Sequence, residues 1–212
     1  MRQQYFEVLA KELKYKLEPK FVLDIGCAGG LLVHAFRRIG VLCYGIDIHP
    51  SGDGTIKADA RSLPFKDCVF DLVTAIEVLE HIKDYDVVIS EINRVLKPNG
   101  FVFITTPTPV EQSVRRLFGS ASDEHVVVRF GKFWVNEFES RGFVRRDFED
   151  YFFKVDELIR SGYGVGFEFE VARFISRLGL FKVLLKSWWK NALLFQKYDK
   201  GGKNKEACEG RI

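Results

Sequence analysis

Apolar residues follow two different spacings along this chain, and each spacing predicts one kind of element. Short runs rich in β-branched and aromatic residues predict buried strands at 21–25, 41–46, 54–58, 70–76 and 101–105. Apolar residues at every third or fourth position predict helices at 2–17, 31–39, 84–96 and 132–141, and two more strands are expected at 143–153 and 192–198. Because strands alternate with helices, we expect an α/β fold, doubly wound, with a mostly parallel sheet and helices on both faces.

The connection between the second and third strands is too short for this pattern. Only residues 48–53 join them, whereas parallel strands normally need a dozen or more connecting residues, most often a helix. We therefore expect one crossover helix to be missing. Part of one sheet face must then be covered otherwise or left open, and the N-terminal helix or the long helix near the C-terminus could fill the gap.

A second amphipathic stretch precedes the last strand. Its apolar residues at helical spacing are Val171, Phe174, Ile175, Leu178, Phe181, Leu185, Trp188 and Trp189. The pattern predicts a helical insert at 154–190 that packs on the domain as a cover, inside a single domain at 1–198 with a disordered tail at 199–212. Trp and Lys at the end of 171–190 also suit a membrane surface, which is the alternative placement.

Composition narrows the class of protein. The net charge of +3 over 212 residues is too small to indicate nucleic-acid binding by itself, although basic residues gather between 171 and 205. The four cysteines show no C-x-x-C spacing, so we expect reduced thiols, no metal site and a cytoplasmic protein, with peripheral membrane contact as the alternative. No signal peptide and no run long enough to cross a bilayer are expected.

Two glycine-containing motifs suggest the ligand. The sequence VLDIGCAGG at 22–30 ends a buried strand in an acidic residue and a glycine-rich turn, and GIDIHP at 45–50 ends the next strand in Asp47. This order is typical of a mononucleotide-binding α/β half, in which the second acid accepts hydrogen bonds from ribose hydroxyls. The spacing D-x-G-x-x-G-G differs from the pyrophosphate-binding G-x-G-x-x-G, so we expect an adenosine ligand without phosphates.

Four segments in order resemble one family. They are VLDIGCAGG, GIDIHP, DARSLPFKDCVFDLVTAIEVLEHI and EINRVLKPNGFVFITTP, with a weaker match in FGKFWVNEFESRGF. Over roughly residues 20–150 the chain is similar to class I S-adenosylmethionine-dependent methyltransferases, and most similar to the branch of the ubiquinone and menaquinone biosynthesis enzymes. The resemblance implies a Rossmann-like methyltransferase fold with seven strands, or slightly fewer, and S-adenosylmethionine as the methyl donor.

The resemblance also implies roles for single residues. Asp24 and the glycine-rich loop would surround the methionyl part, Asp47 would hold the ribose, and Asp59 would accept from the adenine amine. The implied cofactor-binding set is Asp24, Gly26, Cys27, Gly29, Gly30, Asp47, Ile48, Asp59, Ala60, Ile76 and Glu77. Ala28 departs from the glycine that the family often has there, a mild change if the backbone keeps a negative φ, where a methyl group can fit.

Methyl transfer needs a base only where the acceptor is a hydroxyl or a carbon acid. His81, just past the fourth strand, and His125, after the fifth, are the candidates, because histidine titrates near neutrality. Each has a structural alternative: a helix-end contact for His81 and a surface position for His125.

The preferred function is methylation of an O or C atom on a small hydrophobic or amphipathic acceptor. RNA methylation by the basic C-terminal region is the first alternative, but that region contains no recognisable RNA module. A polar, sugar-type acceptor and a non-catalytic scaffold with the cofactor fold are the others. The N/D-P-P-Y/F signature of many amino-methylating enzymes is absent after strand four, where Ala75, Ile76 and Glu77 stand.

Overall fold

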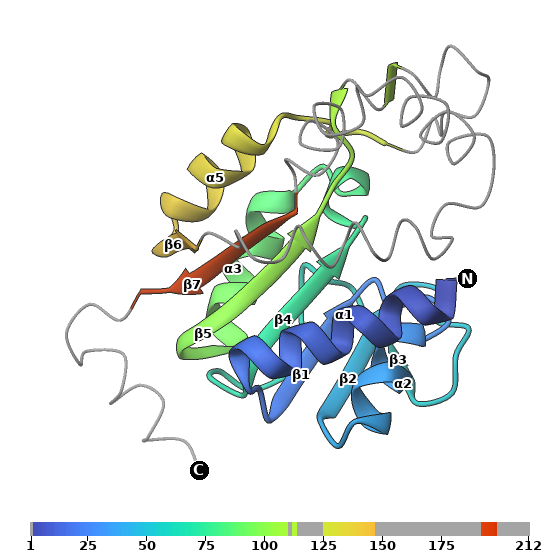
Figure 1. Ribbon diagram of the computed structural model, residues 1–212. Coiled ribbons are helices and arrows are strands. Elements are labelled where there is room, and N and C mark those ends of the chain that lie inside the picture. The colour runs from blue at the N-terminus through green and yellow to red at the C-terminus, as the bar shows by residue number, and fades with distance from the viewer. Residues whose placement is uncertain (1, 110–111, 114–124, 147–191, 199–212) are drawn as a thin grey trace, which may run out of the picture.

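A single mixed sheet organises the computed structural model, which describes residues 2–109, 112–113, 125–146 and 192–198. Its seven strands lie in the order β3-β2-β1-β4-β5-β7-β6 (Figure 1). The strands are β1 (Phe21–Ile25), β2 (Leu42–Asp47), β3 (Thr55–Lys57), β4 (Phe70–Ile76), β5 (Leu96–Thr105), β6 (Phe143–Arg146) and β7 (Leu193–Lys197). The first five are parallel, and β7 pairs antiparallel with both β5 and β6. The predicted doubly wound α/β fold is confirmed.

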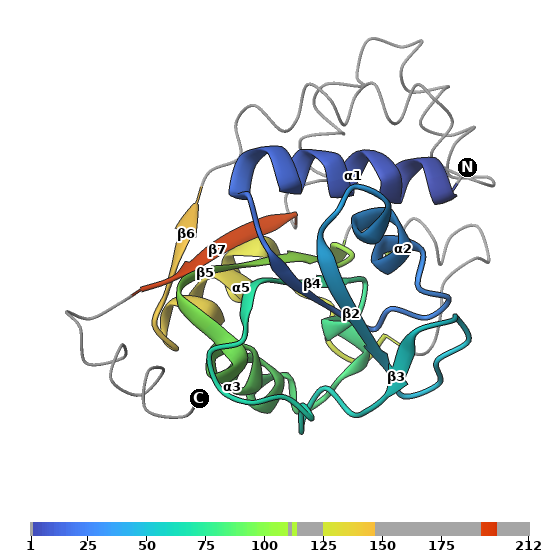
Figure 2. The ribbon, with the colours of Figure 1, turned by 90° about the horizontal axis from the view of Figure 1, so that it is seen from below.

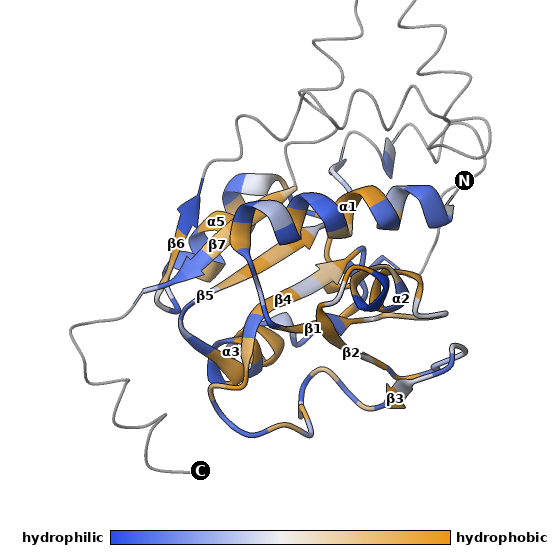
Figure 3. Ribbon diagram, turned by 60° about the horizontal axis from the view of Figure 1, so that its bottom comes forward, coloured by the Kyte–Doolittle hydropathy of each residue, from blue (hydrophilic) through white to orange (hydrophobic). Residues whose placement is uncertain are grey.

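Helices cover both faces of this sheet (Figure 2). They are α1 (Arg2–Leu17), α2 (Leu31–Arg38), α3 (Tyr85–Val95) and α5 (Gly131–Glu139), with a 3₁₀ turn η1 (Leu79–His81) after β4. One face lies under α1 and α2, where the buried cluster joins Leu9, Phe36 and Phe103. Hydrophobic segments gather between the helices, while the ends of α1 are hydrophilic (Figure 3). The apolar face of each helix thus lies toward the sheet.

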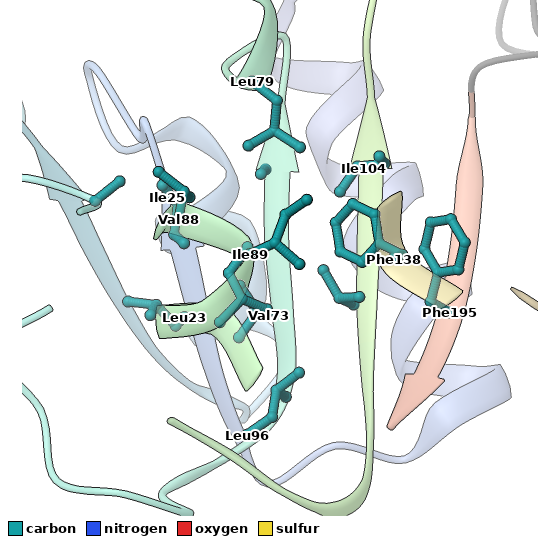
Figure 4. Packing of buried hydrophobic residues seen from close by; sticks show 14 of the residues in the cluster. Leu23, Ile25, Val73, Leu79, Val88, Ile89, Leu96, Ile104, Phe138 and Phe195 are labelled. Carbon is teal, nitrogen blue, oxygen red and sulfur yellow. The ribbon is translucent and has the colours of Figure 1, made fainter. Parts of the chain in front are cut away.

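The opposite face lies under α3 and α5. Its cluster includes Ile89 from α3, Val73 from β4 and Phe138 from α5. Phe138 stacks on Phe195 of β7 with ring centroids 4.4 Å apart (Figure 4). A strand from the end of the described chain therefore locks α5 onto the sheet.

No helix joins β2 to β3, as predicted. The right-handed rule would place such a helix on the face of α2. On that face β3 presents Thr55 and Lys57, because Thr55 is paired with Gly45, whose α-carbon faces Val33 of α2. No other segment is needed to cover this part of the sheet, because β3 presents polar side chains on this face.

Several predicted boundaries differ from the structure. Residues 97–100, between the predicted helix at 84–96 and the predicted strand at 101–105, lie inside β5. There Phe70 pairs with Leu96 and Leu72 with Phe101, so that four residues bulge from the ladder. Asn99 adopts a φ of 62° within this bulge. Strand β6 is described only to Arg146, and the predicted insert at 154–190, with its membrane alternative at 171–190, and the tail at 199–212 lie outside the described residues. Within the described part, no helix is both long and apolar enough to span a membrane.

The cysteine prediction is partly wrong. Cys27 and Cys43 are free and buried, but Cys68 is disulfide-bonded. Sequence spacing could not show this, because a disulfide depends on proximity in space between residues far apart in the chain.

Candidate functional site

The glycine-rich loop is held against the end of β2. The backbone N–H groups of Gly26 and Cys27 both donate to the carbonyl of Ile46, at 2.8 and 3.0 Å. Gly26 has a φ of 70°, and a Cβ there would lie 2.3 Å from Cγ2 of Val78. Only glycine fits, so the loop and the segment after β4 approach each other closely at the carboxyl ends of the strands. Ligands of open α/β sheets bind at this edge.

Asp47 is anchored at the same edge. Its Oδ2 accepts from the Ala28 N–H at 2.9 Å, and its Oδ1 accepts from the His49 N–H at 2.8 Å. Each carboxylate oxygen can accept further hydrogen bonds, because an ionised carboxyl has about four lone-pair sites. The carboxylate is therefore held in one orientation, with lone pairs left to accept from a ligand.

Ala28 contradicts the expectation of a negative φ. Its φ is 44°, in the left-handed region where a Cβ is strained. The reason is the hydrogen bond above: the turn must aim the Ala28 N–H at Asp47. The residue keeps the geometry that glycine would adopt more easily.

Asp24 is almost fully buried beneath the loop, with 4% of its surface exposed. Thr74 donates its hydroxyl to Asp24 Oδ1 at 2.7 Å. Burial raises the Asp24 pKa to about 7, opposed by the Thr74 hydrogen bond and assisted by the charge of Asp47. A cation placed beside Asp24 would favour the ionised form. The neighbouring Cys27 thiol has its pKa raised to about 12, mainly by burial, so it is a poor nucleophile.

The short β2–β3 connection also contacts the glycine-rich loop. Sequence reasoning included Ile48 of this connection but missed the contacts made by Ser51 and Gly52. Ser51 N–H donates to the Ala28 carbonyl at 3.2 Å, and a Cβ on Gly52 would lie 2.3 Å from the Gly29 carbonyl oxygen. Gly52 therefore lets the connection rest directly on the glycine-rich loop. The available signal was a glycine in the unusually short linker.

Helix α2 begins at the other end of the loop. Gly30 precedes it with a φ of 72°, and among the described residues no side chain caps its first turn. Unpaired backbone N–H groups and the helix dipole favour an anion at such a helix start. A carboxylate of a ligand in this loop would suit it.

Asp59 stands beside the ribose candidate but is engaged by another residue. The Ala58 N–H donates to the Asp47 carbonyl at 3.0 Å, which fixes this segment next to Asp47. Both oxygens of Asp59 accept from the Arg61 guanidinium, at 2.7 to 3.1 Å, and these bonds lower the Asp59 pKa. Arg61 also pairs with Asp84 at 3.1 Å. The adenine role of Asp59 stays a prediction that requires sharing with Arg61.

The other implied contacts surround the same edge. Ala60 is buried, while Ile48 is exposed to 56% and stands open to a ligand. Ile76 is half-buried at the end of β4, and the exposed Glu77 follows with a φ of 55°. The Glu77 N–H donates to the Thr105 carbonyl at 3.0 Å, which ties the ends of β4 and β5 together.

The two candidate histidines meet in space. The rings of His81 and His125 form an edge contact, with centroids 4.7 Å apart. Both lie next to Glu80, which is completely buried and whose carbonyl accepts from the N–H groups of Val126 and Val127 at 2.8 and 2.9 Å. His125 is thus half-buried against His81, and its role as a base stays a prediction. Sequence reasoning missed Glu80, although it directly precedes His81.

Comparison with known proteins agrees with this geometry. Residues 1–151 match the family described as "Methyltransferase domain". The chain belongs to the methyltransferase-domain family. A norajmaline N-methyltransferase of Rauvolfia serpentina is 38% identical over 41% of this chain and 36% of its own length. A ubiquinone biosynthesis O-methyltransferase of Bordetella avium is 31% identical over 45% of this chain and 46% of its own length. The alignments thus span less than half of each curated relative.

Solved structures share the fold. A methyltransferase dependent on S-adenosylmethionine from Archaeoglobus fulgidus superposes with a TM-score of 0.60 at 18% identity, over 93% of this chain and 95% of that one. The [4+2]-cyclase SpnF superposes with a TM-score of 0.55 at 19% identity, over 91% and 81% of the two chains. The fold is thus that of the class I methyltransferases, and because one fold can host different reactions, it does not fix the chemistry.

Proposed function

We propose that this chain transfers a methyl group from S-adenosylmethionine to a small acceptor. The observation that carries the proposal is the anchored Asp47 carboxylate, fixed by the N–H groups of Ala28 and His49 next to a glycine-rich loop. It offers two oriented acceptors to a ribose. Membership of the methyltransferase-domain family supports the same ligand.

Each residue of the site would then have a defined task. Asp24, buried below the loop, would face the positive charge of the methionyl part, and the start of α2 would face its carboxylate. Bound S-adenosylmethionine supplies a methyl group activated by its sulfonium. The chain would hold the acceptor in line with that methyl group, and alignment of this kind can contribute up to about 7–11 kcal/mol.

We further propose a hydroxyl-bearing acceptor of hydrophobic or amphipathic character. On transfer, a bond forms between the acceptor oxygen and the methyl carbon, the carbon–sulfur bond breaks with both electrons passing to sulfur, and the hydroxyl proton is released. His81 and His125 lie beyond the end of β4 and are the candidates to take that proton. The name of the Bordetella avium relative, an O-methyltransferase, supports this acceptor class.

The topology supports a cover over the acceptor. Strand β7 is antiparallel to β5 and to β6, so β6 runs in the same direction as β5. The chain therefore leaves β6 and re-enters β7 at the sheet edge where the carboxyl ends of β1, β2 and β4 meet. The described residues that flank 147–191, Arg146 and Ala192, therefore lie toward the same end of the sheet as the site.

Binding of the cofactor tests the proposal. We expect wild-type protein to bind S-adenosylmethionine in calorimetry, and Asp47→Ala to weaken binding by about 100-fold or more, since two hydrogen bonds to a charged group are lost. Asp86→Ala, an exposed acid on α3, is the control and should bind as wild type does. Equal affinities for wild type and Asp47→Ala would remove the ribose assignment.

Product formation separates the acceptor classes. Demethylated cofactor would be measured with a hydrophobic phenol, a sugar and an RNA as acceptors. We expect turnover with the phenol. Turnover with the sugar or the RNA alone would replace the proposed acceptor by that class, and cofactor binding without turnover of any acceptor would favour the non-catalytic scaffold.

A further inference from the structure

A second cluster of ligating side chains lies beside the cofactor loop. One ligand atom each from Glu80, His81 and His125 can be chosen so that all three atoms lie within 4.8 Å of one another. The three come from two segments that are 44 residues apart in sequence, so no spacing motif shows them. The backbone bonds from Val126 and Val127 to the Glu80 carbonyl hold the second segment in place.

The donor set is that of a transition-metal site. Two imidazoles and one carboxylate suit divalent ions such as Zn²⁺, Co²⁺, Mn²⁺ or Fe²⁺, whereas Mg²⁺ and Ca²⁺ prefer oxygen ligands alone. Around an ion with bonds of about 2.1 Å, tetrahedral donors lie about 3.4 Å apart, so the side chains need to close by up to about 1.4 Å. His81 has 36% of its side chain exposed and lies in a one-turn helix, and it can make this adjustment.

Burial of Glu80 supports a cation at this place. A carboxylate that is removed from water completely is costly unless a positive charge compensates it. Nε2 of His81 lies 3.9 Å from Oε1 of Glu80, a separation too long for a direct hydrogen bond. An ion between the two groups would replace this loose contact with two short ones.

The site also lies where an acceptor would need it. Val78, two residues before Glu80, packs against Gly26 of the cofactor loop. We propose that Glu80, His81 and His125 bind one divalent transition-metal ion whose remaining coordination positions face the acceptor. This assignment replaces the expectation from the sequence that the chain has no metal site. Its link to catalysis rests on the proposed function: the ion would bind the acceptor hydroxyl and lower its pKa, and His81 and His125 would hold the ion instead of taking the proton themselves.

Metal binding is tested without any turnover. Metal-free full-length protein would be titrated with Co²⁺, followed by visible absorption, and Zn²⁺ would then displace it. We expect saturation at one equivalent. His81→Ala and His125→Ala should each weaken binding by about 100-fold or more, because loss of even an outer partner of a metal ligand costs 10–100-fold.

Glu80→Gln probes the buried ligand. If Glu80→Gln does not fold, His81→Ala still tests the site, because His81 is partly exposed. His34→Ala removes a histidine from α2, away from the cluster, and should titrate as wild type does. Absence of saturable Co²⁺ binding in wild type, or equal affinity in wild type and His81→Ala, would overturn the site.

Cofactor binding distinguishes this failure from failure of the proposed function. Calorimetry with S-adenosylmethionine on His81→Ala should give the wild-type affinity, because the Asp47 and glycine-loop contacts are unchanged. Metal binding without cofactor binding in wild type would refute the proposed function and keep the metal site. Cofactor binding without metal binding would refute the metal site and keep the proposed function.

Discussion

At the scale of single residues, the site stores strain in order to orient its groups. Ala28 has a φ of 44°, and its N–H is the donor that fixes Asp47. Left-handed backbone costs a non-glycine residue roughly 1–2 kcal/mol, and glycine avoids this while losing about 0.5–1 kcal/mol of chain entropy. Strain of this kind is common at functional sites, where the surrounding structure holds it.

We therefore expect Ala28→Gly to raise the free energy of unfolding by about 0.5–1 kcal/mol, measured from denaturant midpoints. Ala35→Gly is the matched control. Ala35 is buried inside α2, so glycine there should lower stability by about 1 kcal/mol or more. A loss of stability in Ala28→Gly would mean that the methyl group contributes packing that outweighs the strain.

Asp24 is a second strained residue of the site, because its buried surroundings disfavour the ionised carboxylate. Burial raises its pKa to about 7, so between about pH 4 and pH 7 the folded protein binds a proton that the unfolded chain has released. The free energy of unfolding therefore falls as the pH rises through this window and then stays level.

Asp24→Asn removes this titration and keeps an oxygen that can accept from Thr74. We expect the variant to gain stability over wild type as the pH rises from 5 to 8, on the order of 2–4 kcal/mol at the upper end, while its cofactor affinity drops. Urea unfolding at both pH values measures the gap. A gap that does not change with pH would contradict the role of burial.

At the scale of elements, the short β2–β3 connection replaces a helix and supports the cofactor loop. A Cβ on Gly52 would lie 2.3 and 2.5 Å from the carbonyl oxygen and carbon of Gly29, which are backbone atoms with little room to move. Gly52→Ala should therefore push the two loops apart. We expect cofactor affinity to fall on the order of 10–100-fold in calorimetry, because displacements near 1 Å have effects of this size.

The control for Gly52→Ala should lose stability without touching the site. Gly40 follows α2 with a φ of 78°, and a Cβ there would meet no atom within 4 Å. Gly40→Ala should lower stability by about 1–2 kcal/mol through backbone strain and leave cofactor affinity unchanged. If Gly52→Ala also kept its affinity, the connection would be only a linker.

The elements also show what the sequence could predict. Continuous apolar runs located β1 and β4 to the residue, and the short linker correctly indicated the missing helix. The beginning of β5 could not be predicted, because Leu96 joins the ladder only through its pairing with Phe70 across a bulge. Glu80 and the contact between His81 and His125 were likewise hidden, since proximity across 44 residues has no local pattern.

At the scale of the whole molecule, the sheet is completed by a strand that follows a long excursion of the chain. Arg146 of β6 pairs with Leu194 of β7 in an antiparallel ladder, so the two ends of the excursion lie side by side. A hairpin loop of two to five residues can join such strands. Residues 147–191 can thus be replaced by a short turn while the seven-stranded sheet keeps every strand.

This replacement tests the cover over the acceptor. Asp24, Asp47 and the glycine-rich loop remain, so we expect cofactor affinity within about twofold of the full chain, measured by calorimetry. Turnover of a hydrophobic phenol should fall about 100-fold or more, because the acceptor would lose the surface that aligns it with the methyl group.

Removal of 209–212, which follow the last cysteine, should change neither value. Retained turnover would show that the described residues alone bind the acceptor, which would then be a polar molecule held at the open sheet edge. Lost cofactor affinity would instead place part of the excursion in the cofactor site.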